Sequence, residues 1–467
     1  MKIQNSSSLY QGRYILLTAI IAGFAGLLLG YDGGIIGVSK DQVMRLFLLS
    51  NNQWSIIAGA SISGALVGLP ISGKLSNKFG RKNMLILVAI GFISGILLTA
   101  TSEGMVQFLL GRFITGISIG MGSFTIPLFI SEIAPAHVRG AFLLINGIAI
   151  TVGQSLSFLV GYFLHSTGAE SWRHLVFIGI IPALFLLIGM VFIPPSPRWI
   201  AMNFGIEKAR PILNKLRRNS FIVEKELIEI KEILKQDSNI SFMKLFSHPL
   251  KKVTLVGITL GMLQQLMGIG TLLYYGPYIF HKAGFTLQSD AIFATFGIGV
   301  VNLISTISLL FLIDRFGRRP LLLIGTLIAG ISLILVGIIN QAELSNPWLT
   351  FLCLSTFIIG YCISLGSLFW IITAEIYPLK VRGLAMSFAA MAETLASLLV
   401  TLTFLPLVQL AGLSHTYLVY AGMCFLSFIF IYFYVPETKA ISLEQIESNV
   451  YAGIRPRYLG SVDAGAQ

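Results

Sequence analysis

Two ionisable side chains lie alone inside long apolar stretches, where a charge is costly. Asp32 is the one residue between Tyr14 and Ser39 that carries a charge near neutral pH, and Arg112 is alone in the apolar stretch 105–131. An acidic group at the centre of a membrane span costs about 2.5–3.5 kcal/mol on insertion scales. We therefore expect Asp32 to have a partner, for which Arg112 is the natural counter-charge. Either protonation of Asp32 releases Arg112 and changes the packing, or the two form a static pair.

A second isolated acid is Glu393, the one charge between Gly383 and Pro436 apart from His415, which can titrate. If Glu393 faces a cavity, it is a second proton site or selects a ligand that bears an amino group. The alternative is a protonated or hydrated glutamate that replaces a neutral hydrogen-bonding side chain.

The stretch Gly261–Tyr278 lies in the uncharged apolar segment 253–280, which is long enough to cross a bilayer core of about 30 Å. Helix-weakening residues interrupt it at Gly268, Gly270, Gly276 and Pro277. A broken span of this kind is typical of a transport site, because its free amides need protein or water around them. Gln264, Gln265 and Tyr275 add amide and hydroxyl groups that suit a neutral polyhydroxylated ligand. The alternative is a helix-packing seam with interfacial tyrosines.

The composition is that of a polytopic membrane protein. Of the 467 residues, 55% are hydrophobic and 11% are charged, and the mean hydropathy is +0.83. The net charge of +12 comes from basic residues at the ends of apolar spans, so it reports topology and predicts no nucleic-acid partner. Three cysteines inside spans predict neither disulfides nor a metal site. No catalytic motif is present, so we expect a protein that is not an enzyme and has no cofactor.

Twelve apolar spans are predicted, in two sets of six. The spans cover residues 14–37, 54–73, 83–102, 105–131, 140–164, 174–195, 253–281, 291–313, 320–341, 347–374, 383–411 and 416–435. The predicted domains are an N-terminal six-helix bundle (1–197), a cytoplasmic linker with amphipathic helices (198–252), a C-terminal six-helix bundle (253–435) and a cytoplasmic tail (436–467). In the linker, Leu227, Ile230 and Leu234 share one helix face.

The distribution of basic residues sets the expected orientation. With both termini in the cytoplasm, 27 of the 32 Lys and Arg lie inside and 4 lie outside. This bias predicts cytoplasmic termini.

Three pairs of motifs recur at nearly the same offset. NKFGRK (77–82) recurs 237 positions later as DRFGRR (314–319), and SEIAPAHVRG (131–140) recurs 243 positions later as AEIYPLKVRG (374–383). PPSPR (194–198) and PETK (436–439) end the two halves, 242 positions apart. The halves are therefore expected to be parallel repeats of an even number of spans.

These motifs carry a resemblance to a known family. The order of GYDGGIIG (30–37), GRFITGISIGMG (111–122), PSPRW (195–199), QQLMGIGTLLYY (264–275) and the repeated motifs above resembles that of the sugar porter family of the major facilitator superfamily. This family includes bacterial proton-coupled xylose and galactose symporters and animal facilitative glucose carriers. The resemblance implies an all-α polytopic membrane protein with the major facilitator fold, whose twelve transmembrane helices form two pseudo-symmetric six-helix bundles.

The resemblance also implies roles for individual residues. Asp32 and Arg112 match the proton-coupling pair of the symporters, whereas facilitative carriers have a neutral residue at the Asp32 position. The implied cytoplasmic gate pairs acids and bases across the two halves, and consists of Arg81, Glu132, Arg139, Arg318, Glu375 and Arg382. Basic loops that report only topology are the alternative. Asn77 and Pro195 stand where the family has acids, so the N-terminal half of the gate is expected to be the weaker one.

The implied substrate contacts are only partly retained. The candidates are Gln154, Gln264, Gln265, Asn302, Trp370, Glu393, Asn146 and Tyr275. Gly147 and Gly270 replace two expected amides, and Glu393 stands in a segment where the family often has Asn-Trp.

Three functions follow, in order of preference. The first is a proton-coupled symporter of a monosaccharide or polyol that works by alternating access. The second is a symporter or exchanger of another small metabolite, and the third is a non-transporting membrane sensor. We expect a monomer in the plasma membrane or a bacterial inner membrane, with protons and the lipid bilayer as its other partners.

Overall fold

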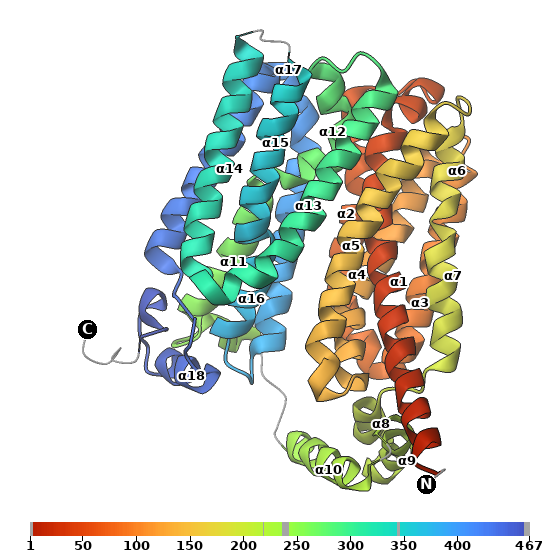
Figure 1. The fold of residues 1–467 in the computed structure, drawn as a ribbon, viewed down its shortest axis with the longest axis vertical. Helices are drawn as coiled ribbons and strands as arrows, with labels where there is room; N and C mark the ends of the chain where they lie inside the picture. The colour runs from red at the N-terminus through yellow and green to blue at the C-terminus, as the bar shows by residue number, and fades with distance from the viewer. Residues whose placement is uncertain (1–2, 218, 236–241, 343–345, 462–467) are drawn as a thin grey trace. The chain divides into compact units, whose positions relative to one another are not determined.

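The computed structural model describes residues 3–217, 219–235, 242–342 and 346–461, and of these it describes the side chains outside 3–13, 15, 136–139 and 233–235 (Figure 1). Every regular element in the described ranges is a helix. In chain order the longer helices are α1 (Ile3–Leu46), α2 (Asn51–Phe79), α3 (Arg81–Ala100), α4 (Met105–Ile133), α5 (Ala136–His165), α6 (Ser171–Ile178), α7 (Ile180–Phe192), α8 (Pro197–Phe204), α9 (Ile206–Arg217), α10 (Ser220–Lys235), α11 (Lys251–Leu266), α12 (Ile269–Lys282), α13 (Gln288–Phe316), α14 (Arg318–Gln341), α15 (Pro347–Tyr361), α16 (Ser367–Ile376), α17 (Arg382–Tyr434) and α18 (Leu443–Tyr451). Short helical turns are η1 (Phe242–Phe246), η2 (Cys362–Gly366) and η3 (Pro456–Tyr458).

Eleven segments in the described ranges are long and apolar enough to cross a membrane. The last of them, α17, has 53 residues and would be about 80 Å long, which is enough for two crossings of a core of about 30 Å. Gly412 interrupts it with φ 80° and ψ 165°. The predicted spans 383–411 and 416–435 lie on the two sides of this kink, so the prediction of twelve crossings agrees with the structure.

The contacts divide the chain into two units, each of which is described on its own. The first unit comprises residues 1–32, 63–154 and 172–239, and the second comprises 33–62, 155–171 and 240–467. This division groups the outer parts of α1, α2 and α5 with the C-terminal helices. The domain boundaries expected from the sequence remain predictions.

In the first unit, α3 packs against α4 and α7. The three short helices α8, α9 and α10, which come later in the chain, pack together around a small core of their own. The apolar faces of α8, α9 and α10 meet there through Ala201, Leu213, Val223, Leu227 and Ile230, all buried. The predicted apolar face of the linker helix is therefore confirmed at Leu227 and Ile230, whereas the side chain of Leu234 lies outside the described residues.

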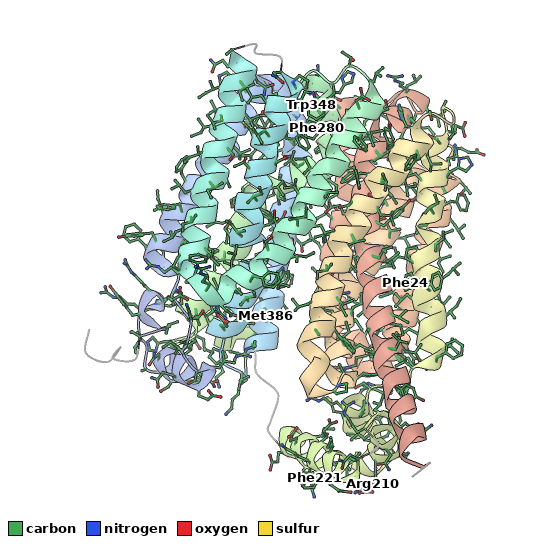
Figure 2. All side chains as sticks on the ribbon, in the orientation of Figure 1. Phe24, Arg210, Phe221, Phe280, Trp348 and Met386 are labelled. Atoms are coloured by element: carbon green, nitrogen blue, oxygen red, sulfur yellow. The ribbon has the colours of Figure 1, made fainter. Side chains whose placement is uncertain are left out.

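In the second unit, α17 packs against α11 and α14, and α12 packs against α13. Aromatic rings pack together at one end of this unit. The ring of Phe285 lies 5.8 Å from that of Phe280 and 5.4 Å from that of Trp348, centroid to centroid, and Phe280 and Trp348 lie close together in Figure 2.

Gly268 produces the predicted break in the seventh span. It has φ 92° and separates α11 from α12. A Cβ atom at this position would lie 2.8 Å from the ring of Tyr420. Backbone conformation and space therefore both require glycine here.

The expected result for Gly268→Ala is a loss of stability of at least about 1–2 kcal/mol, because an L-residue in the left-handed region costs this much before any clash with Tyr420 is counted. The measurement is thermal unfolding of the detergent-purified protein. Gly422→Ala is the matched control, since nothing lies within 4 Å of a Cβ at Gly422 in α17. Equal melting temperatures for the two variants would contradict this explanation of the break.

The sequence analysis missed a second break in the second unit. The π-helical turn η2 separates α15 from α16, and Ser364 within it has the non-helical values φ −115° and ψ −121°. The broken helices thus leave backbone groups available for side chains at membrane depth.

Candidate functional site: a buried ion pair, a polar cluster on broken helices and two end pairs

The predicted pair of Asp32 and Arg112 forms in the first unit. Arg112 Nη1 of α4 lies 2.5 Å from Asp32 Oδ1 of α1, and the two side chains are only 3% and 4% exposed. The hydroxyl of the preceding residue, Tyr31, donates to the carbonyl of Leu175 at 3.0 Å and so fixes this part of α1 against α6. Arg112 Nε has no hydrogen-bond partner among the described residues. The acid is therefore neutralised in a buried position, where a change in its protonation would alter the pairing of Arg112.

In the second unit, the two adjacent glutamines at the end of α11 connect three elements. Gln264 Nε2 donates to the carbonyl of Gly366, at the junction of η2 and α16, at 3.0 Å. Gln265 Nε2 donates to Glu393 Oε1 of α17 at 2.6 Å. We call Gln264, Gln265 and Glu393 the amide–carboxyl cluster. It links the two broken spans to α17, so a ligand that displaces one of these bonds would act on helix ends that can move.

The amide–carboxyl cluster offers more acceptors than donors. One N–H of each amide is used by a protein oxygen, whereas Gln264 Oε1 is buried without a partner in the described part of the chain. Glu393 forms no ion pair with any described residue. The cluster is therefore suited to a ligand rich in O–H or N–H donors.

The other predicted substrate residues of the second unit differ in how far their side chains are exposed and in whether protein groups already occupy their hydrogen-bonding atoms. Trp370 is 43% exposed, so its ring face is accessible. Asn302 is half-buried, and its Oδ1 accepts from the thiol of Cys362 at 3.0 Å. Tyr275 is fully buried, donates to the carbonyl of Thr401 at 2.7 Å and stacks on Phe404. The structure thus gives Tyr275 a packing position and does not bring it to the amide–carboxyl cluster.

The two candidates in the first unit are both buried on α5. Asn146 Nδ2 donates to the carbonyl of Ala22 at 2.9 Å and so ties α5 to α1. Gln154 is 7% exposed.

The predicted gate residues form one ion pair in each unit. In the first, Arg81 Nε lies 3.1 Å from Glu132 Oε2. In the second, Arg318 Nη2 lies 2.8 Å from Glu375 Oε1. Each pair joins the start of a helix that follows an FGR turn to the end of another helix, as the sequence repeat requires. We call Arg81–Glu132 and Arg318–Glu375 the end pairs. The expected pairing across the halves is not among these contacts, because both ion pairs join residues of one unit.

The two remaining gate candidates are placed less completely. Arg382 Nε donates to the carbonyl of Tyr377 at 3.1 Å, at the start of α17. The side chain of Arg139 lies outside the described residues.

Sequence reasoning missed three further members of the end pairs. The hydroxyl of Ser196 donates to Glu132 Oε2, and the hydroxyl of Thr438 donates to Glu375 Oε2. Both hydroxyls belong to the repeated motifs PPSPR and PETK, and that repetition was the available signal. Glu437 adds a cap in the second unit only, because its carboxylate accepts from the backbone N–H groups of Arg318 and Arg319 at 3.1 and 3.0 Å.

Among the described residues of the first unit no carboxylate accepts from the N–H groups at the start of α3, and Pro195 stands at the position that matches Glu437. The indole N–H of Trp199 donates to the carbonyl of Asn77 at 2.8 Å, in the last turn of α2, and so does not cap the N–H groups at the start of α3. The end pair of the first unit therefore lacks the charged helix cap of the second.

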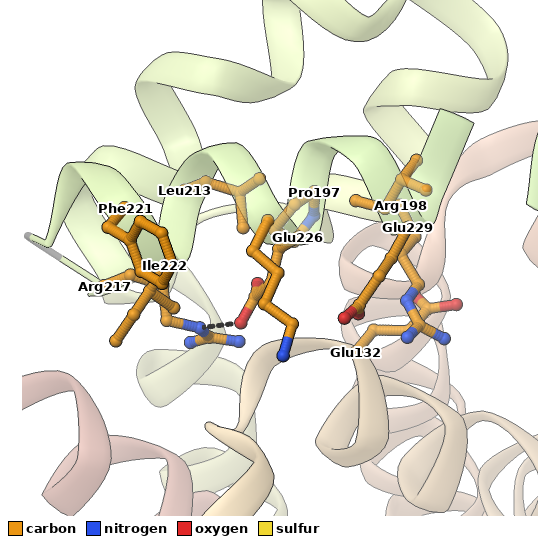
Figure 3. A pocket seen from close by; sticks show the side chains of 11 residues that line it. Glu132, Pro197, Arg198, Leu213, Arg217, Phe221, Ile222, Glu226 and Glu229 are labelled. Atoms are coloured by element: carbon orange, nitrogen blue, oxygen red, sulfur yellow. Dashed lines mark hydrogen bonds and ion pairs between the residues drawn. The ribbon is translucent and has the colours of Figure 1, made fainter. Parts of the chain in front are cut away.

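A buried arginine holds the linker helices to α4. Arg217 of α9 donates from Nε to Glu226 Oε1 at 2.7 Å and from Nη1 to the carbonyl of Ile133 at 2.8 Å. Arg217, Glu226 and Glu132 line a cavity of about 340 Å³ between α4 and the linker helices. Figure 3 shows Arg217 pointing toward Glu226 in this cavity. The linker is thus attached to the end of the helix that carries Arg112 and Glu132.

Comparison with known proteins places this arrangement in a family. The sequence profile described as "Sugar (and other) transporter" matches residues 18–450. The chain is 36% identical over 428 residues to the "Putative metabolite transport protein YwtG" of Bacillus subtilis, covering 91% of this chain and 93% of the relative. It is 34% identical over 447 residues to the "Galactose-proton symporter" of Escherichia coli, covering 95% and 96%.

Solved structures show the same fold. The inward open conformation of the xylose transporter XylE from Escherichia coli matches with a TM-score of 0.81 and 29% identity, covering 93% of this chain and 99% of that one. The relatives and structural neighbours are transporters, which confirms the expectation of an all-α, multi-pass membrane protein that is not an enzyme. The chain belongs to the sugar porter family of the major facilitator superfamily.

Proposed function

We propose that this protein is a proton-coupled symporter of a neutral monosaccharide or polyol that works by alternating access. The observation that carries this proposal is the buried ion pair of Asp32 and Arg112 in the first unit. A titratable carboxylate at membrane depth is costly, and a coupling role accounts for its presence. The proton gradient would supply the energy, and no cofactor would be needed.

Support for the substrate class comes from the second unit. The amide–carboxyl cluster and the exposed ring of Trp370 offer hydrogen-bond acceptors and an aromatic face. These are the groups that a sugar or polyol, with many hydroxyl donors and apolar ring faces, would contact. Relatives of the chain include the "Galactose-proton symporter" and the "Major myo-inositol transporter IolT", whose names refer to a hexose and a cyclic polyol.

The end pairs support alternating access. Arg81–Glu132 and Arg318–Glu375 lie at helix ends in the basic loops that the charge bias predicts to be cytoplasmic. Such pairs can hold a helix end in one packing and release it in another. We infer cytoplasmic termini on the same grounds, and propose a monomeric transporter of the cell membrane.

A second substrate class is favoured by one observation. Glu393 has no cationic partner among the described residues, and the adjacent Gln264 Oε1 is an unused acceptor. A ligand with an ammonium group would supply three donors and a compensating charge. An amino-bearing metabolite is therefore the alternative to a neutral sugar.

The test of the proposed function is uptake into proteoliposomes under an imposed proton gradient. The solutes are labelled pentoses, hexoses, inositols and the corresponding amino sugars. Uphill accumulation of one neutral sugar or polyol is the expected result. If an amino sugar accumulates and no neutral one does, the second class replaces the first, and if no solute in the panel moves, the proposal of sugar transport is wrong.

The variant Glu393→Gln is expected to keep uphill accumulation but to weaken substrate binding by about tenfold to a hundredfold. A hydrogen bond to a charged group contributes about 1.5–3 kcal/mol, and each 1.4 kcal/mol is a factor of ten. The measurement is the apparent KM for uptake, with Glu444→Gln in the exposed part of the tail as the matched control. An unchanged KM for every transported solute would show that Glu393 does not contact the substrate.

A further inference from the structure

A second cavity, unrelated to the amide–carboxyl cluster, lies at one end of the second unit. It has a volume of about 590 Å³ and is formed by the start of α11, the end of α17 and the turn η3. Its apolar part consists mainly of Leu255, Val256, Phe430 and Phe433. Leu255 and Phe433 are 44% and 55% exposed, so the cavity opens on the surface of these helices and not into their core.

Three basic side chains line the same cavity, and its lining includes no acid from the described part of the chain. Lys252 comes from α11, whereas Arg455 and Arg457 come from the segment around η3. None of the three forms an ion pair with a described residue. The guanidinium of Arg457 lies 5.0 Å from the centre of the Tyr432 ring, a contact that holds the side chain without neutralising its charge. The cavity therefore combines an apolar wall with three positive charges that no described acid pairs with.

The depth of the cavity along the helices matches the membrane interface. Lys252 is the second residue of the membrane span 251–282, and Tyr434 is the last residue of α17. From Lys252 to Thr259, the cavity follows α11 for about 10 Å at 1.5 Å per residue. That distance covers the boundary between lipid headgroups and acyl chains. The segment that contains α18 and η3 lies at the end of the second unit where α11 begins and α17 ends (Figure 1).

We propose that this cavity binds one anionic phospholipid of the leaflet that the basic loops predict to be cytoplasmic. The phosphate would lie among Lys252, Arg455 and Arg457, and the glycerol and upper acyl chain would lie along Leu255 and Phe433. Charge complementarity selects an anionic headgroup, since basic pockets at membrane helices on this side bind such lipids. The C-terminal segment, which the proposed transport function does not use, thereby gains a role as half of a lipid site.

The test is native mass spectrometry of the purified full-length transporter with equal amounts of phosphatidylglycerol and phosphatidylethanolamine that carry the same acyl chains. The expected result for the wild type is one phosphatidylglycerol retained about tenfold more strongly than phosphatidylethanolamine, with the preference falling as salt rises. The variant Lys252→Gln/Arg455→Gln/Arg457→Gln should lose that preference. The charge-conserving variant Arg455→Lys/Arg457→Lys should keep it.

The matched control is Lys208→Gln/Lys215→Gln/Lys231→Gln, which removes the same charge from exposed positions of the linker helices and should behave as the wild type. Equal retention of the two lipids by the wild type would overturn the proposal even if the triple variant failed to fold. Equal retention of phosphatidylglycerol by the wild type and a folded triple variant would also overturn it. A dimer that the triple variant loses, with no lipid bound to the wild type, would assign the cavity to a second copy of the chain instead.

Discussion

Replacing Asp32 by Asn is expected to abolish uphill accumulation while solute exchange continues. Asparagine keeps the shape of the side chain and can still accept a hydrogen bond from Arg112, but it cannot bind the proton. At one proton per solute, a gradient of one pH unit supports about tenfold accumulation, because each unit is worth about 1.4 kcal/mol. The accumulation ratio of the variant should fall to about one.

The measurement is uptake and counterflow of the same solute in the same proteoliposomes. Counterflow needs no net proton movement, so it shows that the variant is folded and binds its substrate. Asp290→Asn is the control, since that side chain is exposed in the first turn of α13 and forms no ion pair with a described residue. Asp32→Asn proteoliposomes that still accumulate solute as the wild type does would rule out Asp32 as the coupling group.

Replacing Arg112 by Met is expected to destabilise the protein by about 3–5 kcal/mol at neutral pH. The substitution leaves the Asp32 carboxylate without its counter-charge at a site where both side chains are only 3–4% exposed. Breaking a buried ion pair in this way costs more than removing both charges. The double variant Asp32→Asn/Arg112→Met should therefore be more stable than the single one.

The free energy of unfolding in detergent, measured for both single variants and the double variant, gives the coupling between the two residues. The expected coupling is favourable and exceeds about 1 kcal/mol, well above the values typical of exposed pairs. If the effects of the single substitutions simply add, the contact between Asp32 and Arg112 contributes nothing, and the coupling mechanism loses its electrostatic basis.

The parts of the fold that sequence reasoning predicted are those with a strong local signal. Apolar length predicted the spans, and the glycines at positions 268 and 270 predicted the break between α11 and α12. The isolation of Asp32 and Arg112 in apolar helices predicted their pairing, because few partners exist for a charge at membrane depth.

The features that were missed depend on contacts between distant residues. The break at η2 lies between Gly360 and Gly366, two glycines that the sequence analysis did not interpret as a helix break. The carbonyl of Gly366 at this break accepts from Gln264, which is 102 positions away. Arg217 similarly looks like one of many basic linker residues until the ends of α4 and α9 come together.

The residues expected to contact substrate show the limit of carrying roles over by position. Tyr275 matches the family motif, yet its hydroxyl and ring are used within the second unit. Gln265 and Glu393 meet as a pair, which neither residue indicates alone. Hydrogen-bond partners decide which side chains remain available for a ligand, and those partners come from other helices.

Sugar-evoked proton movement in proteoliposomes tests the proposed symport most directly. Wild-type protein is reconstituted with a pH-sensitive dye inside the vesicles, and each solute of the panel is added outside without an imposed gradient. We expect one sugar or polyol to acidify the lumen, and Asp32→Asn to abolish the signal while counterflow of that solute persists. A solute that enters the vesicles through the wild-type protein without any change in internal pH would contradict proton-coupled symport.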